Sequence, residues 1–250
     1  MADIHKGVTA HRGNSIEFPE NTLSSIKSAI DLKVDWIEVD IHKTKDNQLV
    51  VIHDKSTGRV ANLNLLVSKS TYQELMNLDM SYNFKKINNI PNIKLQKIPL
   101  LSEAFQLIKF HNQVKLSVQP KCNCVKEIIN LAKEMDVIKN IGFNDISINK
   151  MALVKQIDSE IPVFWDRHPF TIISRDIKNA QQLEFEYIMI HKTRARPYLI
   201  DMAHKYGIKI GVWTVNEKIE MERFLLMGID RIYTDNPRLL ISISTKIAQD

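Results

Sequence analysis

Short runs of β-branched and apolar residues recur along this chain, and most are followed by a segment whose apolar residues stand three and four apart. The runs are typical of buried strands, and the spacing is typical of amphipathic helices. The runs that we predict to be strands are residues 7–11, 35–41, 113–119, 140–144, 161–165, 186–190, 208–215 and 230–235. Eight strands, each followed by a helix, is the number that closes a (β/α)₈ barrel.

The ends of the predicted helices carry matching signals. Pro197 and Pro237 each open an apolar helical segment, as first-turn prolines do. Gly207 and Gly228 each follow a helical segment and stand shortly before the next strand. That position is typical of helix C-caps and of short connecting loops. These boundaries support the alternation of strand and helix.

One segment interrupts the alternation. After the strand at 35–41 comes the turn sequence KTKDNQ and then LVVIHD at 49–54, which we expect to pair with the preceding strand as a hairpin. Residues 54–97 show no regular strand and helix spacing. We therefore predict an α/β fold, a TIM (β/α)₈ barrel, with residues 1–250 as a single domain and an insertion at about 42–97 after the second strand. An eight-stranded doubly wound sheet is the alternative.

Polar residues mark the carboxyl ends of the predicted strands. They are, in chain order, His11, Arg12, Glu38, Asp40, Ser117, Gln119, Lys121, Asp166, His191, Lys192, Trp213, Thr214, Thr234 and Asp235. The amino ends of the same segments show no comparable concentration. In a barrel the carboxyl ends of all strands meet at one mouth, where catalytic residues lie. We therefore expect the functional site at this mouth.

Glu38 and Asp40 form the most informative pair. They stand two apart in the sequence IEVDI, so both carboxylates project from one face of the strand while the apolar residues occupy the other. An apolar face toward the helices would direct both acids into the barrel. Two neighbouring carboxylates repel each other unless a cation lies between them, and a hard divalent cation prefers oxygen ligands. The alternative is that they cap an exposed strand edge; placement in a barrel favours the metal.

His11 and His53 each end an apolar strand, in VTAHRG and VVIHD. A single histidine at such a place is more often structural than catalytic. Two of them beside a carboxylate pair suit general acid–base catalysis near neutral pH. Arg12 and Lys121 would add two cations, an arrangement suited to phosphoryl oxygens. We assign no role to His42, because it follows Asp40 and we expect its side chain to point in a different direction.

Composition narrows the classes of partner. The 250 residues are 44% hydrophobic with a net charge of +5, typical of a globular protein, and the basic residues are scattered, so we expect no nucleic-acid partner. No apolar stretch reaches the roughly 18 residues of a membrane span, and the N-terminal segment lacks the apolar core of a signal peptide. We expect a cytoplasmic protein without a membrane span. Cys122 and Cys124 are expected to be free thiols, and a metal role for this C-x-C is disfavoured.

Several of these motifs together resemble one known family. AHRG, PENTL at 19–23, IEVDI, LVVIHD at 49–54, WTVN and TDNP are similar to the motifs of the glycerophosphodiester phosphodiesterases. The resemblance runs from about residue 8 to 240 in the same order and spacing. The combination is specific, although each motif alone is weak. The family's fold is a TIM barrel with a small insertion after the second strand, which agrees with the pattern above.

The resemblance implies an activity, the hydrolysis of glycerophosphodiesters to sn-glycerol 3-phosphate and an alcohol, assisted by Mg²⁺ or Ca²⁺. It also implies roles: His11 and His53 for acid–base catalysis, Glu38 and Asp40 for the metal, Arg12 and Lys121 for the phosphate, Trp213 beside the glycerol, and Glu20 and Asn21 in support of the first loop. One histidine would deprotonate the attacking hydroxyl group or water, and the other would protonate the leaving alkoxide. Asn21 is also expected to cap the helix that begins with Thr22.

Gln119 departs from the family pattern. The family has a glutamate on the third strand, two residues before the lysine, as a further metal ligand, and this chain has Gln119 two residues before Lys121. The Gln119 carbonyl oxygen remains acceptable to Mg²⁺ or Ca²⁺, so we keep it as a metal ligand. Since the ligand set loses a negative charge, we expect weaker metal binding.

Two other functions stay open. One is the cleavage or cyclisation of lysophospholipids in the manner of sphingomyelinase-D-like enzymes, although the HRG and PENT motifs and the insertion favour the first activity. The other is a catalytically weak protein that binds phosphodiesters, which the presence of both His11 and His53 disfavours. The sequence leaves the head group of the substrate open, and the oligomeric state as well, a homodimer included.

Overall fold

The computed structural model describes residues 5–111 and 113–249. The strands are β1 His5–His11, β2 Val34–Lys43, β3 Leu49–Val51, β4 Lys115–Pro120, β5 Ile141–Asp145, β6 Val163–Arg167, β7 Tyr187–His191, β8 Lys209–Trp213 and β9 Arg231–Thr234. The α-helices are α1 Leu23–Asp31, α2 Tyr72–Met76, α3 Tyr82–Asn88, α4 Leu101–Lys109, α5 Val125–Glu134, α6 Ile148–Ile157, α7 Ile173–Gln182, α8 Pro197–Lys205, α9 Lys218–Leu226 and α10 Pro237–Ile247. Short 3₁₀ helices lie at Val67–Lys69, Ile138–Asn140 and Lys192–Arg194.

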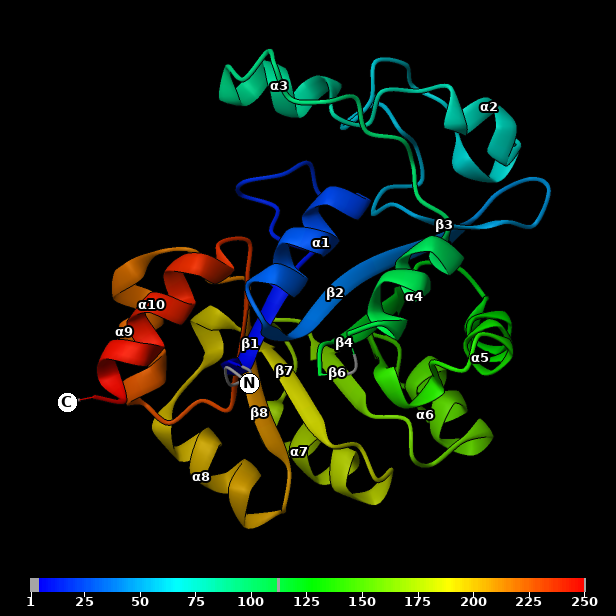
Figure 1. Cartoon of the computed structure of the whole chain (residues 1–250). Helices are drawn as coiled ribbons and strands as arrows, with labels where there is room; N and C mark the ends of the chain where they lie inside the picture. The colour runs from blue at the N-terminus through cyan, green and yellow to red at the C-terminus, as the bar shows by residue number, and fades with distance from the viewer. Residues whose placement is uncertain (1–4, 112, 250) are drawn as a thin grey trace.

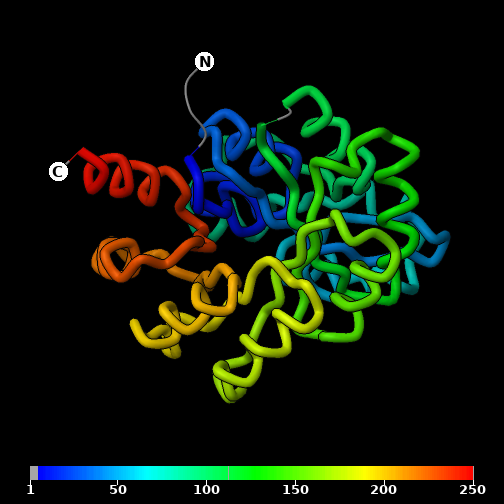
Figure 2. The backbone as a smooth tube through the Cα atoms, turned by 90° about the horizontal axis from the view of Figure 1, so that it is seen from below, coloured from blue at the N-terminus to red at the C-terminus, as the bar shows by residue number. Residues whose placement is uncertain are grey.

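Parallel strands form a closed barrel. The order runs β1-β9-β8-β7-β6-β5-β4-β2, and β1 also pairs with β2, so the sheet closes on itself. Helices surround the strands (Figure 1), and seen from below the chain passes once round the ring from blue through green and yellow to red (Figure 2). The TIM-barrel prediction is confirmed, and the closure excludes the doubly wound sheet. Every predicted strand is present, with small shifts at its ends.

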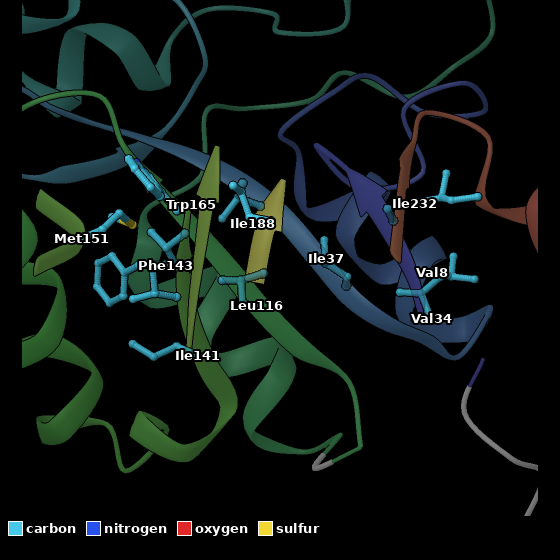
Figure 3. Close-up of a cluster of buried hydrophobic side chains, with 14 of the residues drawn as sticks. Val8, Val34, Ile37, Leu116, Ile141, Phe143, Met151, Trp165, Ile188 and Ile232 are labelled. Atoms are coloured by element: carbon cyan, nitrogen blue, oxygen red, sulfur yellow. The ribbon is translucent and has the colours of Figure 1, made fainter. Parts of the chain in front are cut away.

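The outer faces of the strands build the main core. Ile37, Val39 and Ile41 of β2 are fully buried and belong to one cluster with the apolar faces of the surrounding helices. Figure 3 shows this layer, with labelled side chains from strands around the barrel and Met151 from α6. The alternation of side chains along a strand then leaves Trp36, Glu38 and Asp40 on the inner face. The inward direction predicted for both acids follows from this period of two.

Aromatic residues and a buried arginine fill the interior at the amino ends of the strands. Trp36, Phe164, Met189 and Tyr233 form a separate buried cluster inside the barrel. The Arg231 guanidinium lies among their rings, 5.9 Å from the centre of Trp36 and 5.3 Å from that of Phe164. This cluster fills the interior at the amino ends with apolar and aromatic side chains.

The insertion occupies residues 44–100, between the end of β2 and the beginning of α4. Its strand β3 pairs antiparallel with the end of β2, which confirms the predicted hairpin. Helices α2 and α3 follow, and Figure 1 shows α2 above β3 and α3 above α1. The insertion has a small apolar core of its own, formed by Val50, Ile52, Ala61, Val67, Leu75, Leu78, Met80 and Ile98.

The predicted helix ends agree with the structure. Pro197 begins α8 and Pro237 begins α10. Gly207 and Gly228 follow α8 and α9 with φ of 71° and 82°, values in the left-handed region that favours glycine. Among the described residues, each helix is too short or too polar to cross a membrane.

Candidate active site

A cavity of about 340 Å³ opens at the carboxyl ends of the barrel strands. Its lining residues are His11, Arg12, Glu38, His53, Gln119, Lys121, Asn144, Asp145, Ile146, Asp166, Trp213, Thr214 and Tyr233. Seven of the eight site residues predicted from the sequence are among them. The eighth, Asp40, is fully buried and is bonded to Lys121 of the lining. The structure therefore brings together side chains that are far apart in the sequence.

The loop after β1 begins with the HRG motif and is held close to α1. Gly13 has φ of 81°, and a Cβ atom there would lie 2.6 Å from the backbone of Ser25, so this position requires glycine. The turn directs the backbone N–H of Arg12 to Glu38 Oε2 at 3.1 Å. The motif thus fixes the loop against the carboxylate of β2.

The capping role predicted for Asn21 is wrong. Thr22 caps α1, because its side chain accepts a hydrogen bond from the backbone N–H of Ser25. Asn21 has φ of 55° and instead donates from Nδ2 to Asp40 Oδ2 at 2.8 Å. Its side-chain oxygen also accepts from the backbone N–H of Asp40 at 3.2 Å. Asn21 therefore holds the Asp40 carboxylate in place.

His11 is oriented by a carboxylate that follows the last strand of the barrel. Its Nδ1 lies 2.7 Å from Asp235 Oδ1, and its Nε2 lies 4.0 Å from Glu38 Oε2. Burial alone would lower the pKa of His11, but the hydrogen bond to Asp235 and the charge of Glu38 together raise it. Asp235 is held in turn by Asn216 at 2.6 Å and by Ser15 at 3.1 Å. The sequence marked Asp235 only as a strand-end residue in TDNP.

His53 follows β3 and is oriented by its neighbour. Its Nδ1 lies 2.6 Å from Asp54 Oδ1. Burial lowers the pKa of His53, and the positive charge of Arg12 adds to that effect against the raising influence of Asp40. His42 Nε2 lies 3.1 Å from the backbone oxygen of His53. His42, for which no role was predicted, therefore helps to hold the backbone of His53 in place.

A chain of alternating charges connects the insertion to the barrel. The Arg59 guanidinium binds Asp54 Oδ2 at 2.5 Å and both oxygens of Glu20, at 2.6 and 2.7 Å. Glu20 also accepts from Arg12 Nη1 at 3.0 Å, and Arg12 Nε lies 3.4 Å from Asp40 Oδ2. No role was predicted for Arg59, since nothing in its local sequence pattern indicates a partner at position 20.

Asp40 remains ionised in spite of its burial. Burial would raise its pKa, but the nearby charges of Lys121 and Arg12 hold that pKa below its usual range. Lys121 Nζ lies 2.9 Å from Asp40 Oδ1 and also donates to Gln119 Oε1. The Lys121 ammonium group and the Arg12 guanidinium therefore offset the charge of Asp40 in this structure.

Glu38 and Asp166 carry charge that is less well offset. Burial, followed by repulsion from Asp40, raises the pKa of Glu38 to about 7. Burial also raises the pKa of Asp166 to about 7, with further contributions from Glu38 and from Asp145. A nearby cation stabilises the charged form of a carboxyl group most where burial has raised its pKa in this way.

Gln119 connects Lys121 with Asp166. Its Nε2 donates to Asp166 Oδ2 at 3.0 Å, and Asn144 Nδ2 donates to the same oxygen at 3.2 Å. Ser117 Oγ donates in turn to Asn144 Oδ1 at 2.8 Å. From the sequence, Asp166 was predicted only to be a polar residue at the end of a strand, and no role was predicted for it.

The donor set of the cavity fits a hard divalent cation. Among the described residues, no three His, Cys, Asp or Glu side chains already converge as ligands. The cavity nevertheless gathers the oxygens of Glu38, Gln119 and Asp166, with Asp40 beside them. Oxygen donors with two incompletely offset carboxyl groups match the preference of Mg²⁺ or Ca²⁺. Binding would require these side chains to adjust.

Trp213 forms one wall of the cavity. Its ring meets that of His191 edge to face, with 5.1 Å between centres, and its Nε1 donates to the backbone oxygen of Met189 at 3.3 Å. The indole is thereby fixed while part of it faces the cavity. A fixed aromatic face suits the carbon skeleton of a small ligand.

This chain is similar to several known proteins. Residues 11–239 match the model of the glycerophosphoryl diester phosphodiesterase family. A glycerophosphodiester phosphodiesterase of Caldanaerobacter subterraneus is 30% identical over 96% of this chain and 98% of its own length. A lysophospholipase D of Homo sapiens is 27% identical over 92% of this chain and 83% of its own. A phosphodiesterase of Oleispira antarctica, in complex with the product sn-glycerol-3-phosphate, has the same fold, with a TM-score of 0.80, 22% identity and 96% coverage of both chains.

Proposed function

We propose that this chain, which belongs to the glycerophosphoryl diester phosphodiesterase family and is thus a phosphoric diester hydrolase, converts glycerophosphodiesters to sn-glycerol 3-phosphate and an alcohol. The observation that carries the proposal is a pair of imidazoles, each oriented by a carboxylate, that line one cavity. His11 is bonded to Asp235 and His53 to Asp54. Two such groups can serve as the base and the acid on opposite sides of one phosphorus atom.

The environments of the two rings support different roles. Neighbouring carboxylates raise the pKa of His11, whereas burial lowers that of His53. We therefore assign His11 as the acid that protonates the leaving alcohol oxygen and His53 as the base that deprotonates the attacking group. Pairs of titratable groups whose pKa values are moved apart are typical of such an assignment.

The reaction would proceed in two steps. In the first, His53 takes the proton of the glycerol 2-hydroxyl as its oxygen bonds to phosphorus, and the alcohol leaves with a proton from His11. The product of this step is a cyclic phosphodiester. In the second, water attacks the phosphorus with the histidines in exchanged roles, and the bond to the 2-oxygen breaks to give sn-glycerol 3-phosphate.

Arg12 and Lys121 would bind the phosphate. Both cations line the cavity, and both are now bonded to carboxylates at its edge. A guanidinium group can bind two phosphoryl oxygens at once, while the ammonium group supplies a point charge. Trp213 would pack against the glycerol carbons.

Glu38 and Asp40 would hold a divalent cation, Mg²⁺ or Ca²⁺, with Gln119 contributing its carbonyl oxygen. When bound, such a cation polarises the phosphoryl oxygens and offsets the charge that develops on them. Burial and repulsion from Asp40 raise the pKa of Glu38 to about 7, and this supports a cation at this place, because it would offset the charge of the carboxylate.

Lysophospholipids are a second candidate class of substrate. The human relative at 27% identity is a lysophospholipase D, which favours this class. A protein that only binds phosphodiesters is disfavoured, because binding alone has no need of two histidines that are each oriented by a carboxylate.

The test is an assay with glycerophosphocholine and with lysophosphatidylcholine, each with Mg²⁺, with Ca²⁺ and with EDTA, measuring glycerol 3-phosphate and choline. We expect glycerol 3-phosphate from glycerophosphocholine with metal and its loss in EDTA. Choline from lysophosphatidylcholine alone would favour the second class. No turnover of either substrate with metal present would contradict both. A variant with His11→Asn and His53→Asn controls for contaminating hydrolases.

A further inference from the structure

Asp166 is a buried carboxylate of the cavity with one oxygen that lacks a hydrogen-bond partner among the described residues. It stands on β6 with its side chain on the inner face of the barrel, and it is 7% exposed. Its Oδ2 accepts from Gln119 and Asn144, while Oδ1 is buried and has no hydrogen-bond partner among the residues that the structure describes. A buried carboxylate oxygen without a partner is costly, and such an oxygen is where a ligand would supply the missing interaction.

Gln119 and Asp166 are chemically complementary where they meet. Gln119 Nε2 lies 3.0 Å from Asp166 Oδ2, so an amide donor faces a carboxylate acceptor. A glutamate at position 119 would place two carboxylates at that distance, and they would repel each other. An amide at 119 and an acid at 166 are therefore compatible, and together they keep a third negative charge in the site.

The hydrogen bonds of Gln119 favour a supporting role for this residue. Its carbonyl oxygen already accepts from the Lys121 ammonium group, and its amide nitrogen holds Asp166. Asp166 Oδ1, in contrast, is free of such a donor in the described part of the chain. Asp166 can therefore give a charged oxygen to a cation without losing a hydrogen bond, whereas the Gln119 carbonyl oxygen would first have to release Lys121.

We infer that Asp166, positioned by Gln119 and Asn144, supplies the third carboxylate ligand for the divalent cation, together with Glu38 and Asp40. The inference rests on the proposed function of the site and revises the part assigned to Gln119. The third acid comes from β6 and not from β4. Gln119 acts on the cation through Asp166 and is a positioning residue.

The test measures metal binding without substrate. Free Mn²⁺ is counted by electron paramagnetic resonance, and Mg²⁺ and Ca²⁺ are titrated by calorimetry, for the wild type, Asp166→Asn, Gln119→Glu and the double variant. The matched control is Asp145→Asn, which removes the same charge from the same cavity at a carboxylate that Lys150 already pairs at 3.0 Å. Unfolding in urea with EDTA confirms that each variant is folded.

We expect Asp166→Asn to weaken Mn²⁺ binding by about ten- to a hundredfold, because it removes a charged ligand. Asp145→Asn should stay within about threefold of the wild type, because Lys150 offsets its charge. The double variant should recover most of the loss, since the carboxylate introduced at position 119 then supplies the acid, and the amide introduced at position 166 no longer repels it.

Three results would overturn the inference: unchanged affinity in Asp166→Asn, an equal loss in Asp145→Asn, or a wild type that binds none of the three cations. A raised KM with unchanged metal affinity would instead assign Asp166 to the glycerol hydroxyls. The hydrolysis assay separates the two proposals. If the wild type is active and metal-dependent but Asp166→Asn binds metal as well as the wild type does, only this inference is wrong. If the wild type is inactive but its metal binding requires Asp166, only the proposed function is wrong.

Discussion

Arg59 in the insertion and Glu20 in the first barrel loop are joined by two hydrogen bonds, from Nη1 to Oε2 at 2.6 Å and from Nη2 to Oε1 at 2.7 Å. The same guanidinium group binds Asp54, which orients His53. The insertion therefore does more than cover the barrel. It carries one of the two proposed catalytic histidines and is fixed to the loop that follows the other.

Replacement of this arginine, Arg59→Gln, should lower kcat by about tenfold with little change in KM, because His53 loses its fixed placement while the phosphate-binding cations remain. Steady-state kinetics with glycerophosphocholine measure this. The matched control is Arg238→Gln, since Arg238 binds both oxygens of Glu17 but has no contact with either histidine. An equal decrease of kcat in the two variants would show that any lost surface charge lowers the activity, and would contradict a specific role of Arg59.

Removal of either proposed catalytic histidine should abolish most of the activity. We expect His11→Asn and His53→Asn each to lower kcat by about a thousandfold, because each removes a proton-transfer group. The double variant should be little worse than either single one, since the two groups act as a unit. His204→Asn is the control, because His204 lies on α8 and pairs with Asp230. Substantial activity in His53→Asn would contradict its assignment as the base.

Cys122 should be the reactive thiol of the C-x-C sequence. A hydrogen bond from Cys124, helped by the nearby Lys43, lowers the pKa of Cys122 to about 7, whereas that of Cys124 is raised. The lowered pKa makes the thiolate present above about pH 7 and lost as the pH falls. Alkylation by iodoacetamide, followed by mass spectrometry across pH, should therefore show a midpoint near pH 7 that Cys122→Ser removes. A midpoint near the usual value of about 8.5 would contradict it.

Arg231 should be important for stability and not for catalysis. Its side chain is 2% exposed, donates to Thr9 at 2.9 Å and pairs with Asp35, at the amino end of β2, at 2.5 Å. Arg231→Met should lower the free energy of unfolding in urea by about 3 kcal/mol, because it leaves Asp35 without its partner. The exposed Arg238→Met should change it by less than about 1 kcal/mol. Equal stability of Arg231→Met and the wild type would refute the role.

The sequence by itself determined the order of strands and helices and the face on which the acids lie. Both depend on local periodicity, which repeats every two residues in a strand and about every 3.6 in a helix. Because Glu38 and Asp40 alternate with fully buried apolar residues, their inward direction follows as soon as the strand is recognised. The HRG motif likewise fixes its own turn, since Gly13 adopts a left-handed φ.

The tertiary structure alone decided which partners hold these side chains. Asp235 is 224 residues from His11 in the chain, and Asp166 is 47 from Gln119, yet both pairs are hydrogen-bonded. Asn21 looked like a helix cap by its position, but the barrel places Asp40 beside it. Hydrogen bonding and the offset of charge depend on distance in space, and barrel closure sets that distance. Barrel closure therefore brings Asp166 of β6 beside Gln119 of β4, and no pattern in the sequence places these two side chains together.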